Sequence, residues 1–77
     1  MTKDILLHNA AWLASSLTKT RTYAEASALS GVDPATLSRI LSGKKNSVEI
    51  DTVRQLAQAC GIPPALAVVV RLDEVPE

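Results

Sequence analysis

The chain has 77 residues, and its eight Lys and Arg residues are balanced by eight Asp and Glu residues, so its formal net charge is zero. A chain of this length is expected to form one domain that buries only roughly 60 to 65% of its unfolded surface. A single Cys excludes an internal disulfide, and with a single His it cannot complete a zinc site. The longest apolar run, residues 65 to 70, is too short to span a bilayer, and no signal peptide is recognisable. A cytoplasmic protein with no membrane contact is therefore predicted.

The first predicted helix covers about residues 3 to 18. Thr2 is a suitable cap residue, and apolar side chains recur after it at helical spacing. Trp12 falls near the edge of the apolar stripe, and His8, one turn earlier, is interpreted as a partly exposed surface residue. The stripe itself consists of Ile5, Leu6, Ala10, Leu13 and Leu17.

A second helix is predicted over about residues 23 to 30. Thr22 and Glu25 form the pattern T-x-x-E, the capping box that starts a helix. Gly31 follows the predicted end of the helix and tolerates the positive φ angle of a tight turn, while Val32 is expected to pack between the flanking helices. A helix, a glycine turn and another helix therefore follow one another.

The third helix is expected from Pro34 to Ser42. Asp33 is a favoured N-cap residue, Pro34 a favoured first helical residue, and Gly43 can adopt the left-handed conformation that ends a helix. One face of this helix should be buried, because large apolar side chains recur on it at positions i, i+3 and i+4. These are Leu37, Ile40 and Leu41.

The opposite face of this third helix is unusual for a surface that only meets water. It carries three small residues, Ala35, Ser38 and Ser42, together with Arg39. Short side chains allow another surface to approach closely, and one Arg among them is suited to reach into a groove. The alternative for Arg39 is a salt bridge to a neighbouring acidic residue.

The remaining chain is predicted to form a fourth helix and a further apolar element. The fourth helix should bury Ile50, Val53, Leu56, Ala57 and Cys60 and end at Gly61; Cys60 is interpreted as a small buried hydrophobe. Residues 65 to 72 follow two prolines, and both a helix and a strand are compatible with their sequence. This element is predicted to form a dimer contact, with ordinary core packing as the alternative, through Leu66, Val69, Val70 and Leu72. Residues 73 to 77 form a short acidic tail.

Charge is distributed unevenly along the chain. Residues 19 to 45 contain five basic and two acidic residues, whereas residues 46 to 77 contain two basic and five acidic residues. The positive charge therefore accompanies the segment of helix, turn and helix, which favours an anionic partner for that segment.

These features together resemble the helix-turn-helix domain of the phage repressor and Cro type. The resemblance rests on T-x-x-E-x-x-x-L-S-G-V-D-x-x-T-L-S-R-I-L-S-G-K from Thr22 to Lys44, and on I-D-T-V-x-x-L-A-x-A-x-G-I from Ile50 to Ile62. It implies an all-α fold, a compact domain of four to five helices like that of lambda repressor, over residues 1 to 72. The helix from residue 34 to 42 would then be the recognition helix.

The resemblance also implies which residues contact DNA. Base edges would be read from Pro34, Ala35, Ser38 and Arg39. Tyr23 stands where the family commonly has a glutamine that holds a phosphate, and Pro34 replaces a long amide side chain, so base specificity is expected to depend mainly on Arg39. The loop after the recognition helix would bind phosphate. The alternative is a solvated turn, which is the usual interpretation of such a charge run taken by itself. The expected phosphate contacts are Arg21, Thr22, Tyr23, Thr36, Ser42, Lys44, Lys45 and Asn46.

The function predicted from this resemblance is sequence-specific regulation of transcription. Its most concrete form is a homodimeric repressor that binds an inverted repeat in double-stranded DNA, with half-sites about 34 Å apart. The alternative is a protein-interaction module on the same fold, such as an antitoxin-like or co-regulator subunit. No cofactor is expected. Enzymatic activity is not expected either, because the sequence contains no phosphate loop, metal-ligand cluster or nucleophile with a nearby base. The operator and the sign of regulation stay open.

Overall fold

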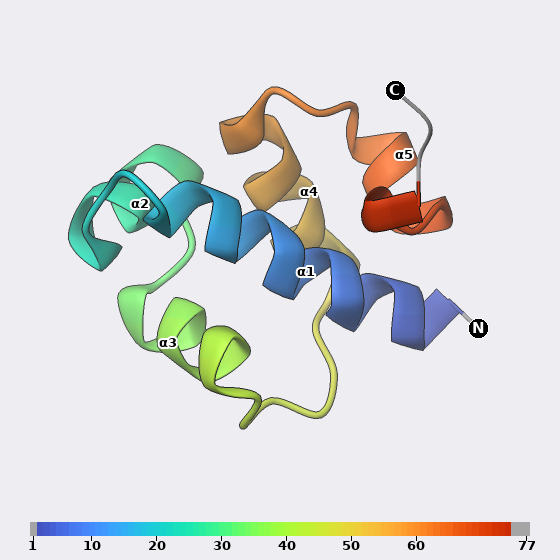
Figure 1. The fold of residues 1–77 in the computed structure, drawn as a ribbon, viewed down its shortest axis with the longest axis horizontal. Coiled ribbons are helices and arrows are strands. Elements are labelled where there is room, and N and C mark those ends of the chain that lie inside the picture. The colour runs from blue at the N-terminus through green and yellow to red at the C-terminus, as the bar shows by residue number, and fades with distance from the viewer. Residues whose placement is uncertain (1, 75–77) are drawn as a thin grey trace.

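Five α-helices and one short 3-10 helix make up the computed structural model, which describes residues 2–74. The long helix α1 crosses the front of the molecule in Figure 1, with α4 behind it, α2 and α3 on one side and α5 on the other. Within residues 2–74 there is no strand, so the all-α fold expected from the sequence is confirmed. The helices are α1 (Thr2–Thr18), α2 (Tyr23–Ser30), α3 (Pro34–Ser42), α4 (Ile50–Cys60), α5 (Pro64–Val69) and the 3-10 helix η1 (Leu72–Glu74).

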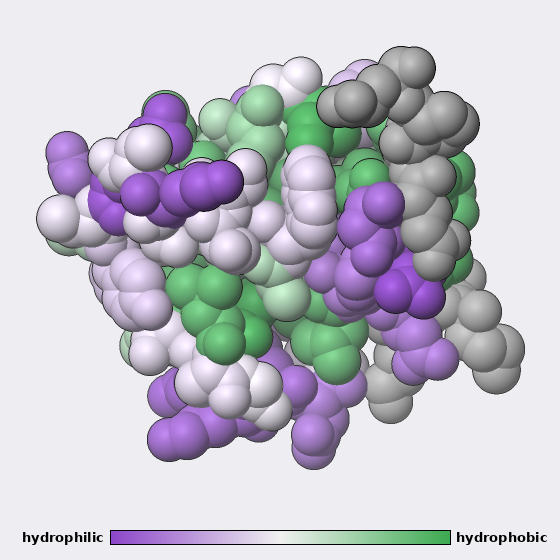
Figure 2. Space-filling view, viewed as in Figure 1, coloured by the Kyte–Doolittle hydropathy of each residue, from purple (hydrophilic) through white to green (hydrophobic). Residues whose placement is uncertain are grey.

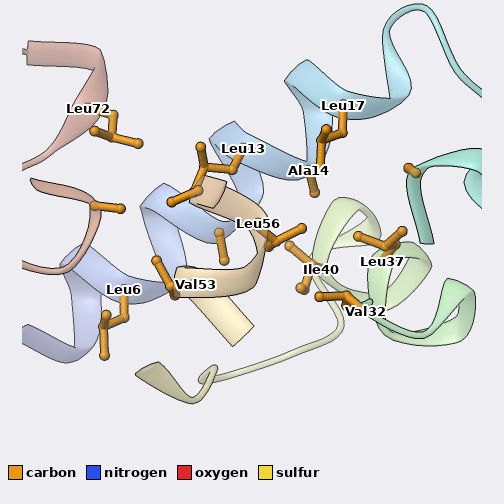
Figure 3. Close-up of a cluster of buried hydrophobic side chains, with 14 residues drawn as sticks. Leu6, Leu13, Ala14, Leu17, Val32, Leu37, Ile40, Val53, Leu56 and Leu72 are labelled. Carbon is orange, nitrogen blue, oxygen red and sulfur yellow. The ribbon is translucent and has the colours of Figure 1, made fainter. Parts of the chain in front are cut away.

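The core lies between α1 and the other helices, all of which α1 contacts. Leu13, Leu17 and Leu37 are among the largest fully buried side chains, and Figure 3 shows α1 and α4 meeting over Leu13 and Leu56. Burial of one such aliphatic side chain contributes about 1.5 to 3 kcal/mol. With no Phe and one Tyr in the chain, this core consists of aliphatic side chains and Ala, and the small ones let the helices approach closely.

Helix α2 begins and ends as the sequence predicts. The Glu25 amide donates to the Thr22 hydroxyl at 3.1 Å, and the Thr22 amide donates to the Glu25 carboxylate at 2.9 Å, so the capping box is complete. Gly31 adopts a left-handed φ of 80°, and its amide donates to the Ser27 carbonyl oxygen. Val32 is buried in the core cluster, as expected for the residue between the two helices.

Helix α3 has the expected bounds but not the expected cap. Asp33 occupies the N-cap position, yet its side chain forms no capping hydrogen bond. The start of α3 is instead defined by Pro34, whose ring presets the helical φ angle, and by the burial of Val32 just before it. At the other end Gly43 has a φ of 77°, and the Lys44 amide donates to the Arg39 carbonyl oxygen at 3.0 Å.

Helix α4 buries a narrower stripe than the sequence suggests. Val53, Leu56 and Ala57 are fully buried, but Ile50 is 45% exposed, because it lies at the first position of the helix beside the exposed loop 43–49. Cys60 is half-buried, with its Sγ 3.7 Å from the Leu13 carbonyl oxygen, and burial raises the pKa of its thiol. The expectation of a buried Ile50 was wrong.

The C-terminal element is a helix and not a strand. Pro64 begins α5, Ala67 is buried in the core, and the chain becomes extended only at Val70 before η1. Leu72 is only 8% exposed and belongs to the core cluster, so most of its surface is unavailable for a dimer contact. Asp73 and Glu74, which the sequence assigned to an acidic tail, belong to η1, and residues 75–77 lie outside the described residues.

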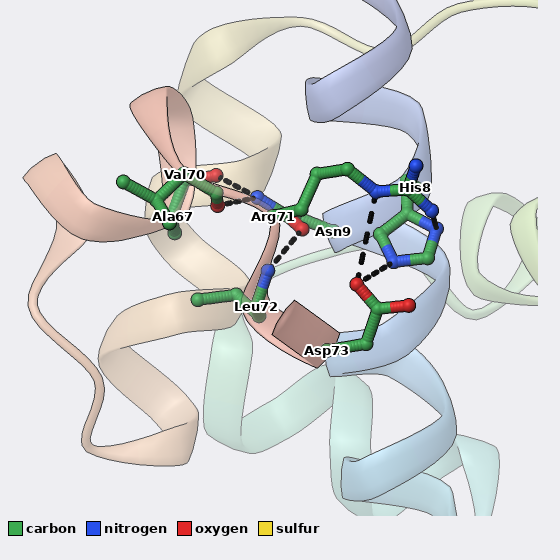
Figure 4. A network of polar contacts seen from close by, with 7 residues as sticks. All are labelled: His8, Asn9, Ala67, Val70, Arg71, Leu72 and Asp73. Carbon is green, nitrogen blue, oxygen red and sulfur yellow. Dashed lines mark hydrogen bonds and ion pairs between the residues drawn. The ribbon is translucent and has the colours of Figure 1, made fainter. Parts of the chain in front are cut away.

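A buried polar residue, Asn9, attaches this C-terminal element to α1. Its Nδ2 donates to the Ala67 carbonyl at 2.6 Å and to the Val70 carbonyl at 2.7 Å, while its Oδ1 accepts from the Leu72 amide at 3.0 Å (Figure 4). The side chain therefore satisfies backbone groups at the end of α5 and at the start of η1, where the helices themselves supply no partner. Next to it, His8 Nε2 lies 2.9 Å from Asp73 Oδ1, so two consecutive residues of α1 hold the end of the described chain.

Candidate nucleic-acid interface

Helix α3 presents two chemically different faces. Leu37 and Ile40 are buried in the core, and Leu41 packs half-buried against it. Because these anchors lie on one side of a helix of nine residues, the opposite side faces solvent along its whole length. The exposed residues on that side are Pro34, Ala35, Ser38, Arg39 and Ser42, with Thr36 half-buried at the margin.

Arg39 is the only charged side chain of α3, and it forms no ion pair with any side chain that the structure describes. Among the side chains that the structure describes, the ion pairs join His8 and Arg71 to Asp73, which belongs to η1 and not to α3. The alternative that Arg39 serves a structural salt bridge therefore finds no partner in the described chain. Its guanidinium keeps its planar set of donors available for an external acceptor.

The entrance to α2 is exposed but partly engaged in local bonds. Arg21 Nη1 lies 3.5 Å from the Leu17 carbonyl oxygen at the end of α1. Hydrogen bonds from the Thr22 backbone and hydroxyl hold the pKa of the Glu25 carboxyl below its ordinary value of 4.5, with a smaller contribution from the nearby Arg21 charge. Since the Thr22 amide and hydroxyl are both already bonded to Glu25, a phosphate at this entrance would be met by the Arg21 guanidinium and the Tyr23 hydroxyl, and by the Thr22 hydroxyl only if it leaves the cap.

The two basic residues of the loop after α3 differ in their exposure to solvent. Lys44 and Asn46 are exposed next to the end of α3. Lys45 is half-buried and lines a hollow formed by α1, Ile40 and Gly43. Lys44 is therefore the more accessible of the two ammonium groups.

The turn between α2 and α3 depends on Ser30, a residue that the sequence interpretation left without a role. Its buried hydroxyl donates to the Ala26 carbonyl at 2.8 Å and accepts from the Val32 amide at 3.1 Å. These two bonds hold the chain on both sides of Gly31, and so help to set the angle between α2 and α3. A Ser directly before the turn glycine was the available signal.

Comparison with protein families decides what this arrangement is. A model described as "Helix-turn-helix domain" matches residues 14–72, from near the end of α1 to the first residue of η1. The chain belongs to the helix-turn-helix family. No curated protein and no solved structure gives a significant match.

Membership of the helix-turn-helix family supports DNA binding as the activity of this chain. The match spans α2 and α3, the pair that carries the exposed small-residue face and Arg39. Among residues 2–74, no helix is long and apolar enough to cross a membrane.

Proposed function

We propose that this helix-turn-helix protein is a sequence-specific regulator of transcription that reads double-stranded DNA through α3. The observation that carries the proposal is the outer face of α3, where small side chains surround one Arg without an ion-pair partner in the described chain. The major groove of B-DNA is wide enough to admit a helix, and small side chains let the helix backbone approach the base edges.

Base reading is assigned to the exposed side of α3. The Arg39 guanidinium matches the O6 and N7 acceptors of guanine with two parallel bonds, worth about 1 to 3 kcal/mol of discrimination. The Ala35 methyl is suited to contact a thymine methyl, and Ser38 offers a hydroxyl between the two. Pro34, at the start of the helix, contributes shape without hydrogen bonds.

Phosphate binding is assigned to the two ends of the helix-turn-helix unit. On one side lie Arg21, Thr22 and Tyr23, and on the other Lys44, Lys45 and Asn46, with Thr36 and Ser42 along the margins of α3. Such contacts set the register of a protein on the duplex without reading sequence. Lys45 is the weakest member of this set, because it is half-buried beside α1.

The proposed assembly is a homodimeric repressor that binds an inverted repeat. One α3 of nine residues reaches few base pairs, and a second copy doubles the site, with half-sites about 34 Å apart. Val69, at 64% exposed, and the exposed Val70 are the apolar side chains of the C-terminal element that remain available for a partner copy.

A second candidate is a protein-interaction module with little DNA binding of its own. It is favoured by the zero net charge of the chain and by Tyr23, which stands where the resembled repressors commonly carry a phosphate-binding glutamine. In this case the outer face of α3 would contact a protein.

Selection of binding sites from random duplex DNA at near-physiological salt separates the two candidates. Recovery of a palindromic motif is the expected result, and the distance between its halves would give the spacing of the two α3 helices. Recovery of no motif by folded protein would overturn the proposal and favour the interaction module. A salt titration adds an independent measure, since each phosphate contact contributes about −0.9 to the slope of log K against log salt.

A further inference from the structure

Helix α3 starts without a side-chain cap of its own. Asp33 stands at the N-cap position, but its side chain makes no capping hydrogen bond. Pro34 fixes only its own φ angle, and the side chains that anchor α3 in the core, Leu37 and Ile40, come later in the helix. The direction in which α3 leaves the turn therefore depends on how residues 30 to 32 are held.

The Ser30 hydroxyl bonds to both sides of this turn. Ser30 is buried, and its hydroxyl donates to the Ala26 carbonyl oxygen at 2.8 Å while it accepts from the Val32 amide at 3.1 Å. The Ala26 carbonyl belongs to α2, and Val32 directly precedes the N-cap position of α3. One hydroxyl therefore joins the end of α2 to the start of α3, and it satisfies an amide that is buried with Val32.

Helices α2 and α4 support the middle of the turn. The Gly31 amide donates to the Ser27 carbonyl oxygen of α2 at 2.7 Å. A methyl group on Gly31 would lie 3.4 Å from Gln55 Nε2, so a side chain of α4 lies directly beside the turn. The Ser30 hydroxyl extends this support past the glycine, to the residue from which α3 departs.

Recognition of a base edge tolerates little change in the direction of α3. Arg39 lies five residues after Pro34, which is about 7.5 Å along the helix at 1.5 Å per residue, so a rotation of α3 by about 10° at the turn displaces the Arg39 backbone by about 1.3 Å. The two parallel bonds from a guanidinium to guanine O6 and N7 need a geometry held within about 10 to 20°. A small change at the turn is therefore large enough to break the reading contact.

Phosphate binding is less sensitive to the direction of α3. Figure 2 shows strongly hydrophilic surface at the upper left, where α1 ends and α2 begins, and along the lower edge, by the loop after α3, with pale and green surface between. Arg21 and Lys44 are exposed basic residues of these two regions. Their long, flexible side chains can follow a phosphate over a displacement of that size. A change in the direction of α3 should therefore reduce discrimination between sequences more than affinity for any duplex.

We propose that Ser30 is a positioning residue for base discrimination, whose hydroxyl fixes the direction of α3 so that both bonds from Arg39 to a guanine can form. The inference rests on the proposed reading of DNA through α3. Ser30 is buried and acts through the Val32 amide and the backbone of α3, not by contact with DNA. A residue that only stabilised the fold would change the free energy of unfolding and leave the discrimination of the folded protein unchanged.

Two variants of the same shape test the hydroxyl. Ser30→Thr keeps it, whereas Ser30→Val puts a methyl group in its place, so any effect of the added carbon is common to both. The measured quantity is the ratio of the Kd for a random duplex to the Kd for the duplex recovered by site selection, in protein that circular dichroism shows to be folded. Ser30→Thr should keep this ratio within about twofold of the wild type, whereas Ser30→Val should lower it about tenfold and change the Kd for the random duplex less than about twofold.

Asn9→Ala is the control for stability, since it removes buried hydrogen bonds to the C-terminal element and none at the turn, and it should keep the wild-type ratio. Residual dipolar couplings of the α3 amides, relative to those of α1, report the direction of α3 without DNA and should change in Ser30→Val but not in Ser30→Thr. Equal ratios for Ser30→Thr and Ser30→Val, or equal losses on both duplexes, would overturn the proposal. Wild-type protein that does not discriminate would contradict the proposed function and with it this role of Ser30, whereas unchanged couplings in Ser30→Val would contradict the positioning role alone.

Discussion

Arg39 and Lys44 lie near each other in the chain but are proposed to do different work. Arg39 projects from the outer face of α3 with its guanidinium unpaired in the described chain, whereas Lys44 follows the helix end in an exposed loop. A planar guanidinium can identify a guanine, while an ammonium group on a flexible stem attracts any phosphate.

Arg39→Ala is therefore expected to cost about 1 to 3 kcal/mol of discrimination at one base pair and to leave other positions unchanged. Lys44→Ala should weaken binding to all sequences about equally and reduce the salt slope by about one. Competition titrations with specific and random duplexes measure both effects. Matching losses on the two duplexes for both variants would reject this division of roles.

Asn9 lies away from the proposed DNA interface, but it is expected to be important for the stability of the fold. Its side chain makes three hydrogen bonds, two to carbonyls and one from an amide, in a fully buried position. Asn9→Ala leaves these backbone groups unpaired, and each unpaired buried group costs about 1 to 3 kcal/mol.

The expected result for Asn9→Ala is a loss of at least about 2 kcal/mol in the free energy of unfolding, measured by urea denaturation. Gln58→Ala, on the exposed side of α4, is the matched control and should change stability by less than about 0.5 kcal/mol. An Asn9→Ala protein as stable as the wild type would mean that water replaces the lost bonds.

At the scale of a single element, the start of α2 combines a structural cap with a proposed phosphate entrance. The Glu25 carboxylate accepts from the Thr22 amide, and the Thr22 bonds lower its pKa. A carboxyl whose pKa is lowered by folding stabilises the folded state above its unfolded pKa, and this contribution is lost as pH falls through the folded pKa.

Glu25→Gln keeps a side-chain oxygen that can accept the hydrogen bond from the Thr22 amide, but it removes the negative charge at the N-terminus of α2. The variant should melt at a lower temperature than the wild type at neutral pH, and the difference should close as pH falls below the ordinary Glu value of 4.5. Thermal melts of both proteins over this range test it. A difference that stays constant with pH would show that the Glu25 charge plays no part.

At the scale of the whole molecule, the C-terminal element passes from an exposed to a buried side chain within four residues. Val69 is largely exposed, whereas Leu72 is buried against α1. The two residues therefore test different properties, although the sequence assigned both to one dimer contact.

Val69→Asp is expected to convert a dimer to a monomer in sedimentation experiments without changing the circular dichroism spectrum, because an exposed carboxylate costs the monomer little. Leu72→Ala should instead lower the stability of the monomer itself, by about 2 to 5 kcal/mol. Val69→Asp that stays dimeric would move the proposed dimer contact away from α5.

Local signals in the sequence determined the helices that carry the interface. The capping box at Thr22, the glycines after α2 and α3, and Pro34 act within one or two turns, and the observed bounds of α2 and α3 coincide with those expected from these signals. The buried stripe of Leu37 and Ile40 followed from helical spacing, which also placed Arg39 on the outer face.

Only the tertiary structure decided the conformation and burial of residues 64–72, which pack against α1. The helical form of residues 64–69, the burial of Leu72 and the role of Asn9 depend on contacts between residues about 60 positions apart. A short valine-rich segment is compatible with a helix or a strand, so its form depends on the surface of the domain against which it packs.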